Sequence, residues 1–243
     1  MYSIINKIQM SLATNGFIST LRLCRVTSFR FILLGLKSSH RNARATLSQR
    51  DFEFDKRWGV DTSGTSIPNR SEIIGPNWLY GIRYQGINPD ALDQLLSELP
   101  INHEEFTFVD FGSGKGRAII VASRFAFKKI IGVEYSKQLH AIAQNNMSIL
   151  QQNENSYKDF DLIWADAATY APPKGPLVIF LYNPFGKKVM TQLVKNVSNS
   201  YQQEKRRIIV IYFSAAYPDL WRNIGFMKET QTKESFSIYD TDF

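Results

Sequence analysis

The sequence is poor in the side chains that usually bind metals or form disulfides. Cys24 is its single cysteine, which excludes an internal disulfide and a zinc site built on cysteines. The three histidines, His40, His103 and His140, lie far apart in the chain and show no ligand spacing. We therefore expect no metal ion in this protein.

Long apolar runs are also missing from the first 50 residues. Basic side chains recur through this region, so no apolar stretch in it approaches the length of about 18 residues that a spanning helix needs. Its longest apolar run, residues 31–36, is too short for the core of a secretory signal. We expect neither a spanning helix nor a secretory signal here.

Acidic residues are absent from residues 1–50, which carry 8 of the 29 Lys and Arg side chains. The rest of the chain has 21 basic against 22 acidic side chains, so the net charge of +7 belongs to this extension alone. Three interpretations stay open: a basic amphipathic helix on an anionic membrane, a solvated arm that holds an acidic partner, and an organelle-targeting segment. We expect a cytoplasmic protein, peripheral at a membrane if the first interpretation holds.

What the chain does contain is enough apolar material for one packed domain. Of its 243 residues, 44% are hydrophobic and 13% aromatic. We predict a basic extension over residues 1–50, then a connecting segment and helix over residues 51–100, covering a site in a catalytic domain over residues 101–243. From Asp51 to Arg83 glycines and prolines recur too often for a long helix or strand, and a helix opens at Pro89.

From residue 101 onward, short apolar segments alternate with helical patterns. This alternation predicts a doubly wound α/β fold with a seven-stranded, mostly parallel sheet that ends in an antiparallel hairpin. The expected strands are 106–111, 129–133, 160–164, 177–182 and 207–213, the expected helices 116–127, 136–150 and 187–198, and the expected hairpin strands 226–232 and 235–239.

A glycine-rich turn, VDFGSGKG, joins the first of these strands to a helix and is typical of a backbone that approaches a ligand. Gly112, Gly114 and Gly116 give Gly-x-Gly-x-Gly, and Arg117 stands where the dinucleotide fingerprint requires its third glycine. The nucleotide-triphosphate loop fails as well, because Val109 replaces its first glycine. The sequence therefore excludes both phosphate-binding patterns.

Three acids follow successive strands of the predicted sheet. Asp110 precedes the glycine turn, Glu134 ends the next strand, and Asp166 follows the third. Carboxyl ends of neighbouring parallel strands open onto one crevice, so these acids should converge there. A ligand met by acids should bear hydroxyls and positive charge, as a nucleoside with a cationic amino-acid tail does. S-adenosylmethionine fits this description.

The ordered set VDFGSGKG, IIGVE, WADA and FLYNPFG, with the closing hairpin, resembles the class I S-adenosylmethionine-dependent methyltransferases from about Phe106 to the C-terminus. The stretch FDKRWGVDTSG further resembles bacterial methyltransferases of unassigned substrate. The resemblance implies that Asp110 contacts the methionine end, Glu134 accepts both ribose hydroxyls, and Asp166 accepts from the adenine amino group. It also implies that the three glycines let the backbone approach the methionine and ribose.

The stretch FLYNPFG follows the fourth expected strand, and the resemblance places Asn183, Pro184 and Phe185 beside the methyl group. Methyltransferases that act on adenine or protein amides resemble it with Asn/Asp-Pro-Pro-Tyr/Phe, and non-SET histone-lysine methyltransferases with Asn-Asn-Phe. This chain has one proline at that point, so we carry over no nucleic-acid specificity. The Asn183 amide and the Pro184 carbonyl could accept two N–H bonds from an amine, with Phe185 and Tyr182 as an aromatic wall.

Each piece alone has a plainer interpretation. Glu134 could be a solvated strand end, Asp166 a helix cap, and Asn183 part of a turn. Together they predict a methyltransferase, acting on nitrogen of a protein amine (lysine-like) or a small-molecule amine. The alternatives are a non-catalytic module of this fold that binds a nucleoside-like ligand or a membrane, and a nucleic-acid methyltransferase, for which the near-neutral core shows no basic stripe.

Overall fold

The computed structural model describes residues 49–66, 73–75, 77, 83–154 and 160–242. The chain divides into two units, Met1–Arg50 and Asp51–Phe243, and the central sheet with its covering helices belongs to the second. The expectations for the basic extension therefore lie outside the described residues, apart from its last two positions. Among the described helices, none combines the length and hydropathy that a membrane span needs.

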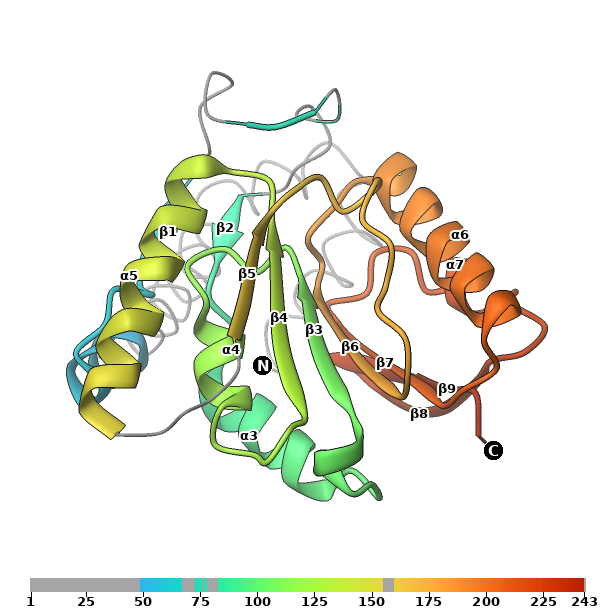
Figure 1. Cartoon of the computed structure of the whole chain (residues 1–243), viewed down its shortest axis with the longest axis horizontal. Helices are drawn as coiled ribbons and strands as arrows, with labels where there is room; N and C mark the ends of the chain where they lie inside the picture. Colours follow the sequence, from blue (N-terminus) through green and yellow to red (C-terminus); the bar gives the residue numbers. More distant parts are fainter. Residues whose placement is uncertain (1–48, 67–72, 76, 78–82, 155–159, 243) are drawn as a thin grey trace, which may run out of the picture. The chain divides into compact units, whose positions relative to one another are not determined.

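A seven-stranded sheet with the order β5-β4-β3-β6-β7-β9-β8 forms the centre of this unit (Figure 1). The first five strands in that order are parallel, and β9 joins β7 in antiparallel pairing and carries β8 as a hairpin. The predicted fold class is thus confirmed. The strands are β3 (Thr107–Phe111), β4 (Lys129–Glu134), β5 (Phe160–Trp164), β6 (Leu177–Tyr182), β7 (Ile208–Phe213), β8 (Lys228–Lys233) and β9 (Phe236–Asp240).

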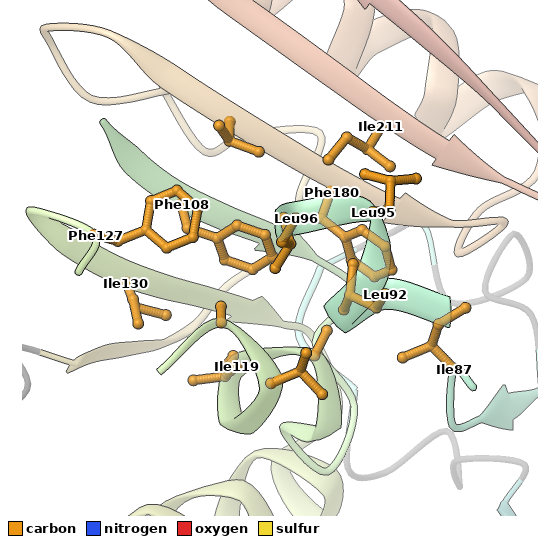
Figure 2. Close-up of a cluster of buried hydrophobic side chains, with 14 of the residues drawn as sticks. Ile87, Leu92, Leu95, Leu96, Phe108, Ile119, Phe127, Ile130, Phe180 and Ile211 are labelled. Atoms are coloured by element: carbon orange, nitrogen blue, oxygen red, sulfur yellow. The ribbon is translucent and has the colours of Figure 1, made fainter. Parts of the chain in front are cut away.

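Helices cover both faces of the sheet, which explains why its central strands are apolar throughout. Phe108 of β3 lies in a buried cluster with Leu96 and Ile119 from two helices, part of which Figure 2 shows. The next residue, Val109, lies in a second cluster with Leu193 and Trp221 on the opposite face. The helices are α3 (Pro89–Glu98), α4 (Arg117–Ala122) and α5 (Lys137–Glu154) on the first face, and α6 (Lys187–Gln203) and α7 (Asp219–Arg222) on the second.

One predicted helix is shorter than expected. The pattern predicted a helix to residue 127, whereas α4 ends at Ala122. The N–H groups of Arg124 and Phe125 donate to carbonyls three residues earlier, which tightens the last turn before the chain enters β4. Phe125 and Phe127 are instead held by ring contacts with His103 from the 3-10 helix η3 (His103–Glu105).

The connecting segment holds more regular structure than predicted. Residues 49–58 are helical, although we expected an irregular chain from Asp51. The expectation failed because the glycines on which it rested begin only at Gly59, which has a positive φ of 69° just after this helix. Further on, β1 (Thr65–Ser66) and β2 (Tyr84–Gln85) form a short antiparallel pair.

Candidate functional site

The candidate site lies at the carboxyl ends of β3, β4 and β6. β3 pairs with β4 on one side and with β6 on the other, so the loops after these strands diverge and leave a crevice. A pocket of about 280 Å³ opens there. Of the residues predicted from the sequence, it is lined by Asp110, Gly112, Gly114, Glu134, Tyr182, Asn183, Pro184 and Phe185.

The glycine turn forms one wall of this pocket and is tied to β4. Gly112 and Ser113 donate their backbone N–H groups to the Val133 carbonyl at 2.9 and 3.1 Å. A side chain at Gly112 would meet Pro184, and one at Gly114 would meet the ring of Tyr84. The first two glycines therefore let the turn approach side chains that form other walls of the pocket.

Gly116 has a different place in the structure. It is the N-cap residue of α4, with a φ of 88°, and it does not line the pocket. A Cβ atom there would lie 3.2 Å from Met147 Cε and 3.4 Å from Ala143 Cβ, both on α5. The third glycine of the motif thus serves the packing of α4 against α5, and its contact with a ligand stays a prediction.

Glu134, the last residue of β4, is 3% exposed and held by two backbone donors. Its Oε2 accepts from Gly114 N at 2.8 Å, and its Oε1 from Ser136 N at 2.8 Å. Burial raises the pKa of this carboxyl to about 7, against the opposing effect of these hydrogen bonds. Each carboxylate oxygen has a second lone pair, so Glu134 can still accept two hydroxyls.

Asp110 lies beside Glu134 and is 4% exposed. Burial first, and then the charge of Glu134, raise the pKa of Asp110 well above its usual range. In the described part of the chain, no donor forms a hydrogen bond with this carboxylate. Two buried acids side by side favour a positively charged ligand, because it would stabilise both ionised forms.

Asp166 lies just beyond β5 and lines a smaller neighbouring pocket rather than the main one. Its Oδ2 accepts from Asn77 Nδ2 at 2.8 Å, and its Oδ1 accepts from the Ala168 N–H at 2.9 Å. The two pockets share Tyr135 and Phe185 in their walls. The predicted adenine acceptor is therefore next to the main pocket, with a residue of the connecting segment as its partner.

On the acceptor side, Asn183 follows β6 with a φ of 38°, in the left-handed region that few residues other than glycine adopt. Its backbone N–H donates to the Phe213 carbonyl at 3.2 Å. Its side-chain Oδ1 is buried and has no hydrogen-bond partner among the described residues. Tyr182 is half-buried in the pocket wall, whereas Phe185 is 5% exposed and belongs to the second core cluster.

Tyr84 and Arg117 are among the pocket residues that the sequence did not identify. Tyr84 of β2 contacts the glycine turn, and its hydroxyl donates to the Thr62 carbonyl at 2.7 Å. No signal marked Tyr84, because the segment before it has no periodic pattern. Arg117 is 2% exposed at the start of α4. Its signal was present in the sequence, since it replaces the third glycine of the dinucleotide fingerprint.

Comparison with known families gives one match. Residues 79–160, about a third of the chain, match the family described as Histone methylation protein DOT1. The matched segment contains the glycine turn and Glu134 but ends before Asp166 and Asn183. No curated protein matches the chain at a significant level.

Several solved methyltransferase structures are similar at low identity. A predicted N6-adenine-specific DNA methylase from Listeria monocytogenes is 14% identical, with a TM-score of 0.49 over 64% of this chain and 51% of that one. The ribosomal protein L11 methylase from Lactobacillus delbrueckii subsp. bulgaricus is 14% identical, with a TM-score of 0.46 over 65% and 79%. The methyltransferase domain of bacterial CtHen1 is 12% identical, with a TM-score of 0.47 over 64% and 98%.

This chain spans about half the length of the Listeria structure, and none of these likenesses bears on the methyl acceptor. The family match and the strand order carry the classification. The DOT1 family consists of class I S-adenosylmethionine-dependent methyltransferases, and the sheet with its closing antiparallel hairpin has the architecture of that class. Residues 79–160 thus resemble a family of class I S-adenosylmethionine-dependent methyltransferases, and the chain has the fold of that class.

Proposed function

We propose that the protein methylates the nitrogen of an amine, with a protein amine such as a lysine side chain preferred over a small-molecule amine. The observation that carries this proposal is the Asn183 Oδ1 atom, which is buried beside the pocket without a hydrogen-bond partner among the described residues. An unsatisfied buried acceptor costs about 1–3 kcal/mol. An amine that donates an N–H to Asn183 Oδ1 would remove that cost, and the hydrogen bond would orient the amine.

The residues of the pocket fit S-adenosylmethionine. Asp110 offers the ammonium of the methionine end a carboxylate that no donor among the described residues occupies, and Glu134 retains a lone pair on each oxygen for the ribose hydroxyls. Asp166 lies beside the same crevice, with Asn77 as its present partner. The cofactor supplies a methyl group on a positively charged sulfur, and that sulfur leaves as a neutral thioether.

The chemistry asks little of the protein beyond positioning. The amine nitrogen forms a bond to the methyl carbon while the carbon–sulfur bond breaks, and the electron pair stays on sulfur, so no acid has to protonate the leaving group. Asn183 Oδ1 and the Pro184 backbone carbonyl would each accept one N–H and direct the nitrogen lone pair along the reaction line. Such positioning can contribute about 7–11 kcal/mol. The methylated nitrogen then loses a proton to solvent.

Two observations support a protein acceptor. The family that matches residues 79–160 is described by histone methylation, and histones are proteins. The acceptor-side stretch has one proline, unlike the double-proline pattern of adenine methyltransferases. Since the matched segment ends before Asn183, the family match supports the cofactor side directly and the acceptor only through its description.

Methyl-labelled cofactor tests the proposal. The full chain is incubated with it and with a cell extract, which is then separated into protein, RNA, lipid and small-molecule fractions. We expect label in the protein fraction, recovered as methylated lysine after hydrolysis. Label in RNA would favour the nucleic-acid alternative. Cofactor binding without label in any fraction would identify a non-catalytic module.

A further inference from the structure

The segments that form the outer wall of the main pocket carry exposed basic side chains that the proposed mechanism leaves unused. Arg83 lines the pocket and is exposed to solvent. Lys187 and Lys188, both exposed, begin α6 two and three positions after Phe185 of the pocket wall. These cations therefore lie where a macromolecular acceptor would contact the protein.

The outer wall has a positive balance that the domain as a whole lacks. Three of its segments hold no acidic residue: residues 83–87, 182–188 and 214–218. The hairpin turn is tied to this wall because Ser214 N–H donates to the Ser235 carbonyl at 2.8 Å, and the one acid of the turn, Glu234, follows Lys233. From residue 51 onward the chain has 21 basic against 22 acidic side chains, so the positive balance is local.

Arg83 differs from other cations near the pocket because it has no acid of its own. Arg117 pairs with Asp51, and Lys115 of the glycine turn pairs with Asp61 at 2.7 Å. The Arg83 side chain forms no salt bridge or hydrogen bond within the described ranges. Its guanidinium can therefore receive a carboxylate from a bound molecule, in the bidentate geometry that arginine favours.

The position of Lys187 and Lys188 opposes the ordinary preference of a helix. A helix N-terminus has a partial positive charge, so acidic side chains stabilise its first turn and basic ones destabilise it. The first turn of α6 contains no acid, and its N-cap residue is Gly186. Positive charge is thus concentrated beside the pocket although it weakens the helix, which favours a role in attracting a negatively charged partner.

The observations favour an acidic protein over a nucleic acid as this partner. Sites for single-stranded nucleic acids combine cations with aromatic side chains on which bases stack. In the described part of the chain, the exposed large hydrophobic side chains are Phe52, Ile74 and Trp164, and none of them lines the main pocket. Carboxylates beside an acceptor lysine need no stacking surface, only cations at the pocket wall.

We infer that the protein methylates a lysine flanked by aspartate or glutamate residues in its protein substrate, and that Arg83 and Lys187 bind those acids. This inference rests on the proposed function and adds to it the local sequence of the acceptor. The flanking carboxylates pair with the cations of the wall while the lysine enters the pocket toward Asn183. A lysine among basic residues would bring like charges together and would be disfavoured.

The extract treated with methyl-labelled cofactor tests the inference on the acceptor. Labelled proteins are digested, and the modified lysines are located by mass spectrometry. We expect aspartate and glutamate to outnumber lysine and arginine around these sites, compared with the lysines of the extract as a whole. Labelled lysines with basic flanks, or label in a small-molecule amine, would overturn the inference alone. Label in RNA, or in no fraction, would overturn the proposed function with it.

Charge reversals test the inference on the protein. Arg83→Glu and Lys187→Glu should each lower kcat/KM for the protein fraction by roughly tenfold at low ionic strength, mainly through KM, because attraction becomes repulsion. The loss should shrink at about 0.5 M salt, which screens exposed charges. Lys174→Glu is the matched control, since Lys174 is exposed and precedes β6 at the opposite end of the sheet. It changes the net charge equally and should leave kcat/KM near the wild-type value.

Calorimetry with S-adenosylhomocysteine separates this role from cofactor binding. Arg83→Glu should bind this ligand within about threefold of the wild-type affinity, because the exposed side chain serves the acceptor. Arg83→Gln, which removes the charge without reversing it, should show a smaller loss of kcat/KM in the same direction. A large loss of affinity for S-adenosylhomocysteine in Arg83→Glu would overturn the inference, as would an equal loss of kcat/KM in Lys174→Glu.

Discussion

Gly112 and Pro184 lie so close together that a Cβ atom at residue 112 would fall 2.5 Å from Pro184 Cβ. The first residue follows β3 and the second follows β6, the two strands that pair at the point where the sheet order reverses. The cofactor-side turn and the acceptor-side stretch are therefore in direct contact. A substitution in the glycine turn should therefore displace the acceptor-side stretch.

Gly112→Ala tests this contact. Gly112 has a φ of 85°, so alanine there suffers backbone strain of about 1–2 kcal/mol and a clash of about 1–3 kcal/mol with Pro184. Gly175→Ala is the matched control, since Gly175 has a φ of 81° and open space where its Cβ would be. Urea unfolding should show a larger loss for Gly112→Ala. An equal loss of unfolding free energy in the two variants would mean that Pro184 moves aside without destabilising the protein.

Glu134 should govern the recognition of the ribose. Glu134→Ala removes the proposed acceptor of the two ribose hydroxyls, each of which would be worth about 1.5–3 kcal/mol as a charged hydrogen bond. We expect affinity for S-adenosylhomocysteine to fall at least about tenfold by calorimetry. A 2′-deoxy analogue should bind the wild-type protein more weakly than S-adenosylhomocysteine does. The two ligands should bind Glu134→Ala with equal affinity. An unchanged affinity in Glu134→Ala would remove this residue from the site.

The ligand-free protein should lose stability as the pH rises. Burial raises the pKa of Glu134 from 4.5 to about 7, so the folded state favours the protonated form. The stability from this group is fully present below pH 4.5 and is lost as the pH rises through about 7, by up to roughly 3 kcal/mol. Asp110 shifts in the same direction.

Unfolding free energies measured between pH 5 and pH 8 check this dependence. Glu134→Gln cannot ionise, so its stability should fall less steeply over that window than that of the wild-type protein. The cationic cofactor should bind more tightly at the upper end, where the acids are ionised. A wild-type curve parallel to that of Glu134→Gln would show that Glu134 does not titrate there.

The fold was largely predictable because its signals are local. β5 and β6 have the predicted bounds, and β6 is a continuous apolar run between Pro176 and Asn183. Glu134 and Asp110 were located for the same reason, as acids at the ends of such runs. The helix over residues 49–58 was missed because the glycines and prolines after it were taken to extend to Asp51, and the contact of Asp51 with Arg117, which is distant in sequence, gave no local signal against this.

Site residues could be predicted from the sequence only where the end of a strand fixes their position. The partner of Asp166, Asn77, lies in a stretch of glycines and prolines whose path no periodicity indicates. Gly116 belongs to the family motif, yet its neighbours are on α5, a contact that depends on how two helices pack. Arg117 was visible in the sequence as a departure from the dinucleotide fingerprint. Its burial was not, because it depends on three residues that precede it by many positions.

Residues 1–48 should be dispensable for folding, whereas the helix that follows should not. Asp51 pairs with the buried Arg117, and the Asp55 carboxylate accepts from the backbone N–H groups of Thr62 and Ser63 at 2.9 and 2.8 Å. A protein that starts at Gln49 should fold and bind S-adenosylhomocysteine, and it should bind anionic vesicles or an acidic partner less than the full chain. A protein that starts at Gly59 should lose about 3–5 kcal/mol, because it leaves a buried charge unpaired. Equal melting temperatures of the two shortened proteins would contradict this boundary.

Asn183 should control the rate of methyl transfer and not the binding of the cofactor. Asn183→Gly suits the test better than alanine, because glycine adopts the φ of 38° without strain and removes only the amide. We expect melting temperature and affinity for S-adenosylhomocysteine to stay close to the wild-type values, the affinity within about threefold, or under about 0.7 kcal/mol. The single-turnover rate of methyl transfer, measured on the extract fraction that accepts the methyl group, should fall by roughly 10²-fold, because the acceptor nitrogen is no longer positioned. Asn183→Ala should show the same loss of rate together with a backbone cost of about 1–2 kcal/mol, which separates the two roles of this residue. If folded Asn183→Gly retained the full single-turnover rate, Asn183 would serve only to end β6, and the amine would have to be oriented by the Pro184 carbonyl alone.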